Sequence, residues 1–123
     1  MSAELSKTVK TPQHDEMTQF VQQGAELTVG GLTMSQISAA LDKKVFYAYD
    51  RQVITSQVQR FRQAMPARIQ LHYAVKANPY PPVVQHLKPL VDGFDVASQK
   101  EMLLAVQSGM PVKDISFAGP GKS

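Results

Sequence analysis

The 123-residue sequence contains neither cysteine nor tryptophan. Without cysteine the chain can form neither a disulfide framework nor a cysteine-based metal site, and we expect a reducing, cytoplasmic setting with no bound metal. Long apolar runs are also missing, since no segment approaches the roughly 18 consecutive apolar residues that a membrane-spanning helix needs. The N-terminus lacks the apolar core of a signal peptide. These absences predict a soluble protein with no membrane partner.

The charge of the chain is small and dispersed. The formal net charge is +3, and the lysines and arginines are scattered instead of forming a basic run or a basic and aromatic patch. This distribution argues against a nucleic-acid-binding surface. With 43% hydrophobic residues, the sequence suits one globular domain or a part of a larger one.

One lysine stands at the end of an alternating apolar segment. From Ile69 to Lys76 the odd-numbered residues are large and apolar, whereas the even-numbered ones, Lys76 among them, are polar or small. This period of two predicts a strand with Lys76 as its last residue, followed by a proline-rich turn. A lysine at a strand end is most often only an exposed cap. A chemical role therefore needs support from the rest of the chain.

Two further segments repeat this alternation. Gly93 to Ala97 places Phe94 and Val96 on an apolar face opposite Asp95, and Ile115 to Ala118 places Ser116 on the corresponding polar face. Helical segments separate the three strands, and this order predicts parallel neighbours. The carboxyl ends of parallel strands share one edge, so Lys76 and Asp95 are predicted to lie on the same rim.

Capping residues and prolines set the predicted helix bounds. Asp50 is a suitable N-cap for a helix that ends before Pro66, and Pro89 predicts that a second helix stops or kinks near Leu87. Three helices are expected, near residues 51 to 64, 82 to 88 and 99 to 108.

Glu101 has two interpretations. Ser98 and Glu101 have the spacing of a capping box, in which the carboxylate reaches back to the Ser98 amide. The same helix start lies on the predicted rim, where an acidic group can also serve a site. The two roles are compatible, and the sequence leaves both open.

The first 44 residues carry structural signals only. Met17, Phe20 and Val21 fall at helical spacing and predict a helix from His14 to Gln23. A short strand is expected at residues 26 to 29, followed by a Gly-Gly turn and a helix that ends near Leu41. Residues 1 to 13 show no periodicity and are expected to be loose.

Three motifs together resemble a known family. They are Tyr-Ala-Val-Lys-Ala-Asn at positions 73 to 78, Phe-Asp-Val-Ala-Ser at 94 to 98 followed by Glu101, and Phe-Ala-Gly-Pro-Gly-Lys-Ser at 117 to 123. They resemble the N-terminal part of the fold-type III pyridoxal-phosphate-dependent decarboxylases of the ornithine/diaminopimelate/arginine group. Within this group the sequence is most similar to the enzymes associated with exosortase systems. The resemblance covers residues 45 to 123, with a weaker extension over 27 to 41.

The resemblance implies a cofactor and a site. Pyridoxal 5′-phosphate would be held as a Schiff base on Lys76, which is the catalytic lysine of the motif. Ala74 would leave room for the cofactor ring, and Asp95 and Glu101 match acidic positions that line the same pocket. The implied reaction is decarboxylation of a small amino acid of the diaminopimelate or ornithine type, by a homodimer.

The resemblance also implies the architecture. The fold class would be α/β, with residues 45 to 123 forming the first three strand-helix units of a (β/α)8 barrel. Residues 1 to 44 would belong with a second, β-rich domain, and Val45 to Tyr49 would form the strand that crosses between the two. The family's phosphate-binding loop, its partner for the ring nitrogen and its dimer-contributed residues lie beyond Ser123. The 123 residues alone are therefore expected to be incomplete and inactive.

Other functions are weighed against this one. Gly121-Lys122-Ser123 resembles the end of a nucleotide-binding loop, but Ser116 stands where that loop needs its first glycine. Alanine-racemase-like and pyridoxal-carrier proteins also place a lysine at the end of a first barrel strand. A non-enzymatic α/β module, in which Lys76 is incidental, remains the third alternative.

Overall fold

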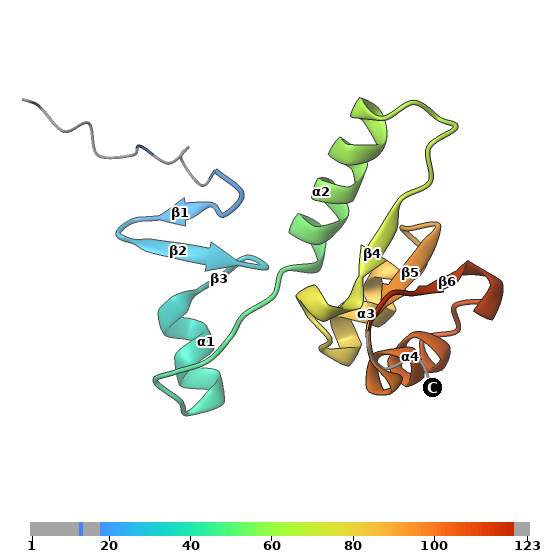
Figure 1. The fold of residues 1–123 in the computed structure, drawn as a ribbon. Coiled ribbons are helices and arrows are strands. Elements are labelled where there is room, and N and C mark those ends of the chain that lie inside the picture. Colours follow the sequence, from blue (N-terminus) through green and yellow to red (C-terminus); the bar gives the residue numbers. More distant parts are fainter. Residues whose placement is uncertain (1–12, 14–17, 120–123) are drawn as a thin grey trace, which may run out of the picture.

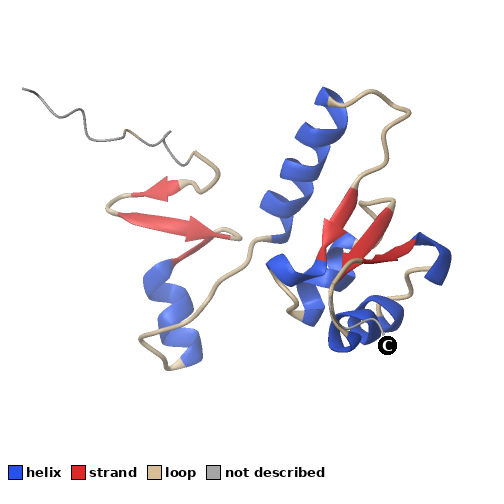
Figure 2. Ribbon diagram, viewed as in Figure 1, coloured by secondary structure: helices blue, strands red, loops and turns tan. Residues whose placement is uncertain are grey.

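The computed structural model describes residue 13 and residues 18–119. Its elements form an N-terminal hairpin unit and a parallel α/β unit (Figures 1 and 2). The hairpin unit contains β1 (Gln22–Gln23), β2 (Glu26–Val29), β3 (Leu32–Thr33) and α1 (Met34–Leu41). The parallel unit contains α2 (Arg51–Ala64), β4 (His72–Ala74), the 3-10 turn η1 (Val75–Ala77), α3 (Pro81–Leu87), β5 (Gly93–Val96), α4 (Gln99–Gln107), η2 (Val112–Asp114) and β6 (Ile115–Phe117).

The N-terminal unit is an antiparallel sheet in the order β1-β2-β3. Gly30 and Gly31 form the turn between β2 and β3 with φ values of 59° and 80°, which favour glycine over residues with a side chain. Thr33 then caps α1 in a capping box with Gln36. The predicted strand at 26 to 29, the glycine turn and the helix to Leu41 are all confirmed.

The helix predicted from His14 to Gln23 is wrong where it can be compared. Residues 14–17 lie outside the described part, residues 18–21 are not helical, and Gln22–Gln23 pair with β2 as β1. Three apolar residues gave a weak helical signal, whereas Gly24, with φ of 63°, allows the chain to turn back onto Glu26 and Leu27. Backbone hydrogen bonds of Gln22 and Gln23 are therefore made to β2 of the hairpin and not within a helix.

Asp50 joins the two units. Its Oδ1 accepts hydrogen bonds from the amides of Gln52 and Val53 and so caps α2, while its Oδ2 accepts from the amide of Gly30 at 2.9 Å. These hydrogen bonds, that of Gly30 most strongly, lower the pKa of the carboxyl. The strand predicted from Val45 to Tyr49, just before Asp50, is wrong, because this segment is irregular and pairs with no strand in the described part of the chain.

The parallel unit has the predicted topology. β4, β5 and β6 form a sheet in that order, and both pairings are parallel. The predicted helices appear as α2, α3 and α4 within a few residues of their expected ends, and α3 stops at Leu87, two residues before Pro89. Parallel pairing follows because each strand returns to the same edge of the sheet through a helix.

The core lies between one face of this sheet and the helices α3 and α4. Val75, Phe94 and Val96 are buried on the sheet side, and Phe94 is 0% exposed. The facing residues are Val83, Val84, Leu87, Ala105 and Met110. The predicted apolar face of the strands is therefore confirmed, which leaves Ala74, Asp95 and Ser116 on the opposite face.

Hydrogen bonds of Asp92 and Arg62 fix the segment that leads into β4. One oxygen of Asp92 accepts from the guanidinium of Arg62 and from the amide of Leu71, both at 2.7 Å. Arg62 also donates to the carbonyl of Leu90. The hydrogen bond from Arg62, and after it that from Leu71, lowers the pKa of Asp92.

Among the described helices, none is long and apolar enough to cross a membrane.

Candidate functional site

The face of the sheet opposite the core carries one short polar row. The parallel register aligns Ala74 of β4 with Asp95 of β5, and Asp95 with Ser116 of β6. The hydroxyl of Ser116 donates a hydrogen bond to Oδ1 of Asp95 at 2.8 Å. Asp95 is thereby oriented by its neighbour, and Ala74 on its other side fills little space.

Lys76 comes two residues after Ala74, the member of this row on β4, and lies beyond the end of that strand. The prediction that the strand reaches Lys76 is wrong, because β4 ends at Ala74 and Lys76 is in the 3-10 turn η1. Pairing with β5 ends before Val75, which is 0% exposed and anchors the turn in the core. Lys76 itself is exposed, and among the described residues its side chain has no hydrogen-bond or ion-pair partner.

Lys76 and Asp95 lie at the same edge of the sheet, as predicted from the strand order. Lys76 is two residues beyond Ala74, and Ala74 is the register partner of Asp95. The two side chains do not form an ion pair within the described part of the chain. The amine is therefore not neutralised by the nearest acidic residue of the row.

Glu101 performs the structural role that its spacing predicts, with one difference. Its Oε2 accepts from the Ser98 hydroxyl at 2.9 Å, and its Oε1 accepts from the amide of Ala97 at 3.3 Å rather than from the Ser98 amide. The Glu101 amide in turn donates to the Ser98 hydroxyl. The extended Ser98 presents the amide of the preceding residue to the carboxylate, and both oxygens of Glu101 hold the end of β5 to α4.

The chain leaves β6 very close to the end of β5. A Cβ atom at Gly119 would lie 2.7 Å from the carbonyl oxygen of Ala97, closer than side-chain atoms approach a backbone. Only glycine permits this path without displacement. Gly119 belongs to the motif at 117 to 123, whose residues 120–123 lie outside the described part.

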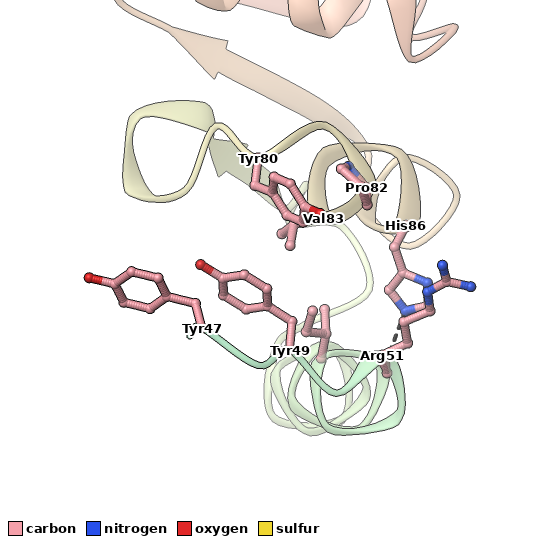
Figure 3. Close-up of a pocket in the computed structure, with 8 residues that line it drawn as sticks. Tyr47, Tyr49, Arg51, Tyr80, Pro82, Val83 and His86 are labelled. Atoms are coloured by element: carbon pink, nitrogen blue, oxygen red, sulfur yellow. Dashed lines mark hydrogen bonds between the residues drawn. The ribbon is translucent and has the colours of Figure 1, made fainter. Parts of the chain in front are cut away.

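Sequence reasoning did not identify an aromatic groove on the outer side of the lysine turn. The groove has a volume of about 500 Å³ and is lined by Tyr47, Tyr49, Arg51, Ile54, Tyr80, Pro82, Val83 and His86. The rings of Tyr49 and Tyr80 stack with centroids 5.7 Å apart. At the other end of the groove, Nε2 of His86 donates a hydrogen bond to the carbonyl oxygen of Arg51 (Figure 3). Tyr80 is far from Tyr47 and Tyr49 in the sequence, so no local pattern predicts the groove. Lys76 does not line it.

Comparison with known proteins gives a specific family match. Residues 51–123 match the family model described as "Pyridoxal-dependent decarboxylase, pyridoxal binding domain". The chain is 33% identical over 98 residues to the diaminopimelate decarboxylase of Aquifex aeolicus, which covers 80% of this chain and 23% of that protein. It is 34% identical over 89 residues to the ornithine decarboxylase of Mus musculus, with 72% of this chain and 19% of that protein covered.

A solved structure shows the same fold. The diaminopimelate decarboxylase from M. jannaschi matches with a TM-score of 0.61 at 20% identity, over 82% of this chain and 25% of that protein. The chain thus spans about a quarter or less of the length of these proteins. At this identity the structural match concerns the arrangement of helices and strands.

Proposed function

Because the chain belongs to the family of pyridoxal-dependent decarboxylases, we propose that it is the lysine-bearing part of a pyridoxal-phosphate-dependent amino-acid decarboxylase. The observation that carries this proposal is the position of Lys76. Among the described residues its amine has no ion-pair partner, and Lys76 follows Ala74, the register partner of Asp95, at one edge of the parallel sheet. In parallel α/β folds this edge is where ligands and catalytic groups gather.

The residues on this edge fit the cofactor. An aldehyde needs a primary amine with no competing ion-pair partner, and Lys76 provides one within the described residues. Ala74, the last residue of β4, precedes Lys76 by two positions and leaves room for an aromatic ring. Asp95, oriented by Ser116, provides a carboxylate at the next strand. These are the groups that would hold pyridoxal phosphate on this part of the chain.

When bound, pyridoxal phosphate supplies an electron sink for the electron pair that remains after carbon dioxide leaves the substrate. Lys76 would hold the cofactor through its amine, and the same amine would carry a proton to the substrate α-carbon. Asp95 forms no ion pair with Lys76 among the described residues and would tune the protonation of the amine through its negative charge. Glu101 holds the end of β5 to the start of α4, and its carboxylate adds negative charge to the rim.

The architecture of the whole protein is part of the proposal. The order β4-β5-β6 with its outer helices supports the proposal that residues 45 to 123 would form about the first three strand-helix units of an eight-stranded barrel. Residues 1 to 44 would belong with a second, β-rich domain. We expect a cytoplasmic homodimer, and the relationship to exosortase-associated enzymes stays a prediction from the sequence.

A diaminopimelate-like or ornithine-like amino acid is the proposed substrate. Relatives named for both substrates match this chain at nearly equal identity, so the choice between them rests on residues elsewhere in the protein. The 123 residues by themselves are expected to bind the cofactor weakly and to be inactive. The resemblance places the phosphate-binding and ring-nitrogen contacts further along the family's sequence.

The experiment measures carbon dioxide release from both amino acids by the protein that contains this chain. Lys76→Ala should lower the rate at least about 100-fold, because a group that transfers protons and holds the cofactor is lost. Lys113→Ala, at an exposed lysine of η2, is the matched control and should leave the rate unchanged. Racemisation without carbon dioxide would favour the racemase-like alternative, and full activity of Lys76→Ala would contradict the proposal.

A further inference from the structure

The turn that carries Lys76 is not fixed by strand pairing, although Val75 at its start is buried in the core. β4 pairs with β5 only as far as Ala74, and Lys76 lies in η1 with its side chain exposed. A short 3-10 turn has weaker hydrogen-bond geometry than a ladder of strand pairs. Other contacts must therefore fix where the lysine backbone lies relative to Asp95.

Two hydrogen bonds close this turn on its far side. The phenol of Tyr73, one residue before Ala74, donates to the carbonyl oxygen of Asn78 at 3.0 Å. The side-chain oxygen of Asn78 accepts from the amide of Tyr80 at 3.1 Å. The carbonyl of Tyr80 then accepts from the amide of Val83 in the first turn of α3. Hydrogen bonds thus connect the last part of β4, before the lysine turn, to the start of α3 after it.

Tyr73 is itself held in place. Its ring packs edge-on against Phe94 of β5, with centroids 6.1 Å apart and ring planes at 69°. Phe94 is fully buried, so the phenol projects from a rigid base toward the turn. Burial raises the pKa of the phenol above its ordinary value of 10.0. At neutral pH the group therefore stays protonated and can donate to the Asn78 carbonyl.

We propose that Tyr73 and Asn78 are positioning residues for Lys76, and that their two hydrogen bonds hold the lysine turn at a fixed place over the end of β5. This inference rests on the proposed function, because a fixed lysine matters only if Lys76 reacts. Neither residue touches the cofactor in this account. Both act on the backbone from which the amine projects.

Tyr73→Phe isolates the hydrogen bond, since the ring keeps its packing on Phe94 while the hydroxyl is lost. Tyr47→Phe is the matched control, because Tyr47 is 89% exposed and donates no hydrogen bond among the described residues. In hydrogen exchange, the amides of residues 76 to 78 and of Tyr80 should exchange about fivefold faster in Tyr73→Phe, the change expected for one lost hydrogen bond. They should not change in Tyr47→Phe.

The chemical measurement separates positioning from stability. The protein that contains this chain is incubated with pyridoxal 5′-phosphate and borohydride, and the initial rate of fixation on Lys76 is divided by that on Lys113 in the same sample. A role in stability alone would not change this ratio while the protein is folded. We expect Tyr73→Phe to lower it about fivefold, in proportion to the loss of the closed turn. Tyr47→Phe should retain the original ratio.

Asn78→Ala removes the second hydrogen bond and should lower the ratio to a similar extent. It also provides the test if Tyr73→Phe does not fold. An unchanged ratio in a folded variant, even with faster exchange, overturns the inference while the proposed function stands. If the unsubstituted protein fixes no cofactor on Lys76, the proposed function itself fails and the inference with it.

Discussion

Glu101 shows how one side chain can serve both the fold and the site. Its two oxygens accept from the Ala97 amide and the Ser98 hydroxyl. A glutamine at this position can still accept from the Ala97 amide with its oxygen and can donate from its side-chain nitrogen to the Ser98 hydroxyl, without the charge. Glu101→Gln should therefore leave the free energy of unfolding nearly unchanged, whereas Glu101→Ala should lower it by about 1 kcal/mol. Urea unfolding of both variants checks this difference.

The activity of Glu101→Gln then tests the site role that the sequence left open. If the carboxylate charge contributes to the rim, the rate of carbon dioxide release should fall although stability is retained. An activity equal to that of the unsubstituted protein would leave Glu101 with its structural role only.

Asp92 gives a prediction about pH. Hydrogen bonds from Arg62 and Leu71 lower its pKa, so the carboxylate stabilises the fold above its ordinary pKa of 3.8, and this contribution is lost as the pH falls through the lower folded value. The contribution should be about 1 kcal/mol or less, because both partners are more than a third exposed to solvent. The measurement is chemical denaturation of the protein and of Asp92→Asn between pH 2 and pH 7.

Asparagine can still accept from the Leu71 amide, so Asp92→Asn removes the charge and little else. The two proteins should differ most at neutral pH and converge in acid. A constant difference across the whole range would show that the ion pair with Arg62 contributes nothing to stability.

At the scale of single residues, the sequence predicted the site partly. Alternation placed Lys76, Ala74 and Asp95 on one face, and the register confirms that Ala74 and Asp95 are neighbours. The position of Lys76 in a 3-10 turn was not predicted, since burial of Val75 depends on helices distant in sequence. The contacts of Ser116 with Asp95 and of Tyr73 with Asn78 require three-dimensional proximity that no spacing reveals.

The helices and strands were predicted best where a capping residue or a proline marks one of their ends. Asp50 caps α2 as expected, and Pro89 lies just beyond α3. Strand lengths were overestimated, because pairing of β4 and β6 depends on the short β5 between them. The failed helix at His14 to Gln23 had an apolar spacing too short to outweigh a hairpin with a glycine turn.

Gly93 at the start of β5 tests how closely the elements pack. A Cβ atom there would meet the carbonyl oxygen of Asp114 and would lie 2.6 Å from the ring of His72. Gly93→Ala should therefore destabilise the protein by about 1–3 kcal/mol, the usual cost of forcing an extra methyl group into a packed site. Thermal unfolding monitored by circular dichroism provides the measurement.

A second substitution distinguishes the two contacts. His72→Ala removes the ring but not the backbone carbonyl of Asp114, so the double variant with Gly93→Ala should recover only part of the lost stability. Complete recovery would mean that β5 and η2 can move apart freely, contrary to the close approach in the structure.

The whole molecule has an open edge beside an apolar groove. Within the described residues β4 pairs only with β5, and a groove of about 430 Å³ lies between α2 and β4, lined mainly by apolar side chains that include Val58, Phe61, Leu71 and Tyr73. Phe61 is 60% exposed at this groove. An unpaired strand edge next to exposed apolar surface favours association.

We therefore expect the 123 residues, produced by themselves, to associate with further copies through this groove. Light scattering over a concentration series should show a mass that rises with concentration. Phe61→Glu should reduce the rise by placing a charge in the groove, while Arg60→Glu, one position away on α2, should have a smaller effect. A constant monomeric mass at high concentration would contradict this expectation.

The central claim concerns the chemistry of one amine, and the most direct measurement locates it. The protein that contains this chain is treated with pyridoxal 5′-phosphate, reduced with borohydride and digested, and the adduct is mapped by mass spectrometry. The account predicts that the adduct is concentrated on the peptide with Lys76, far above the exposed Lys100 and Lys113, and that Lys76→Ala abolishes it. An adduct spread evenly over the exposed lysines, or concentrated on another lysine, would contradict the account.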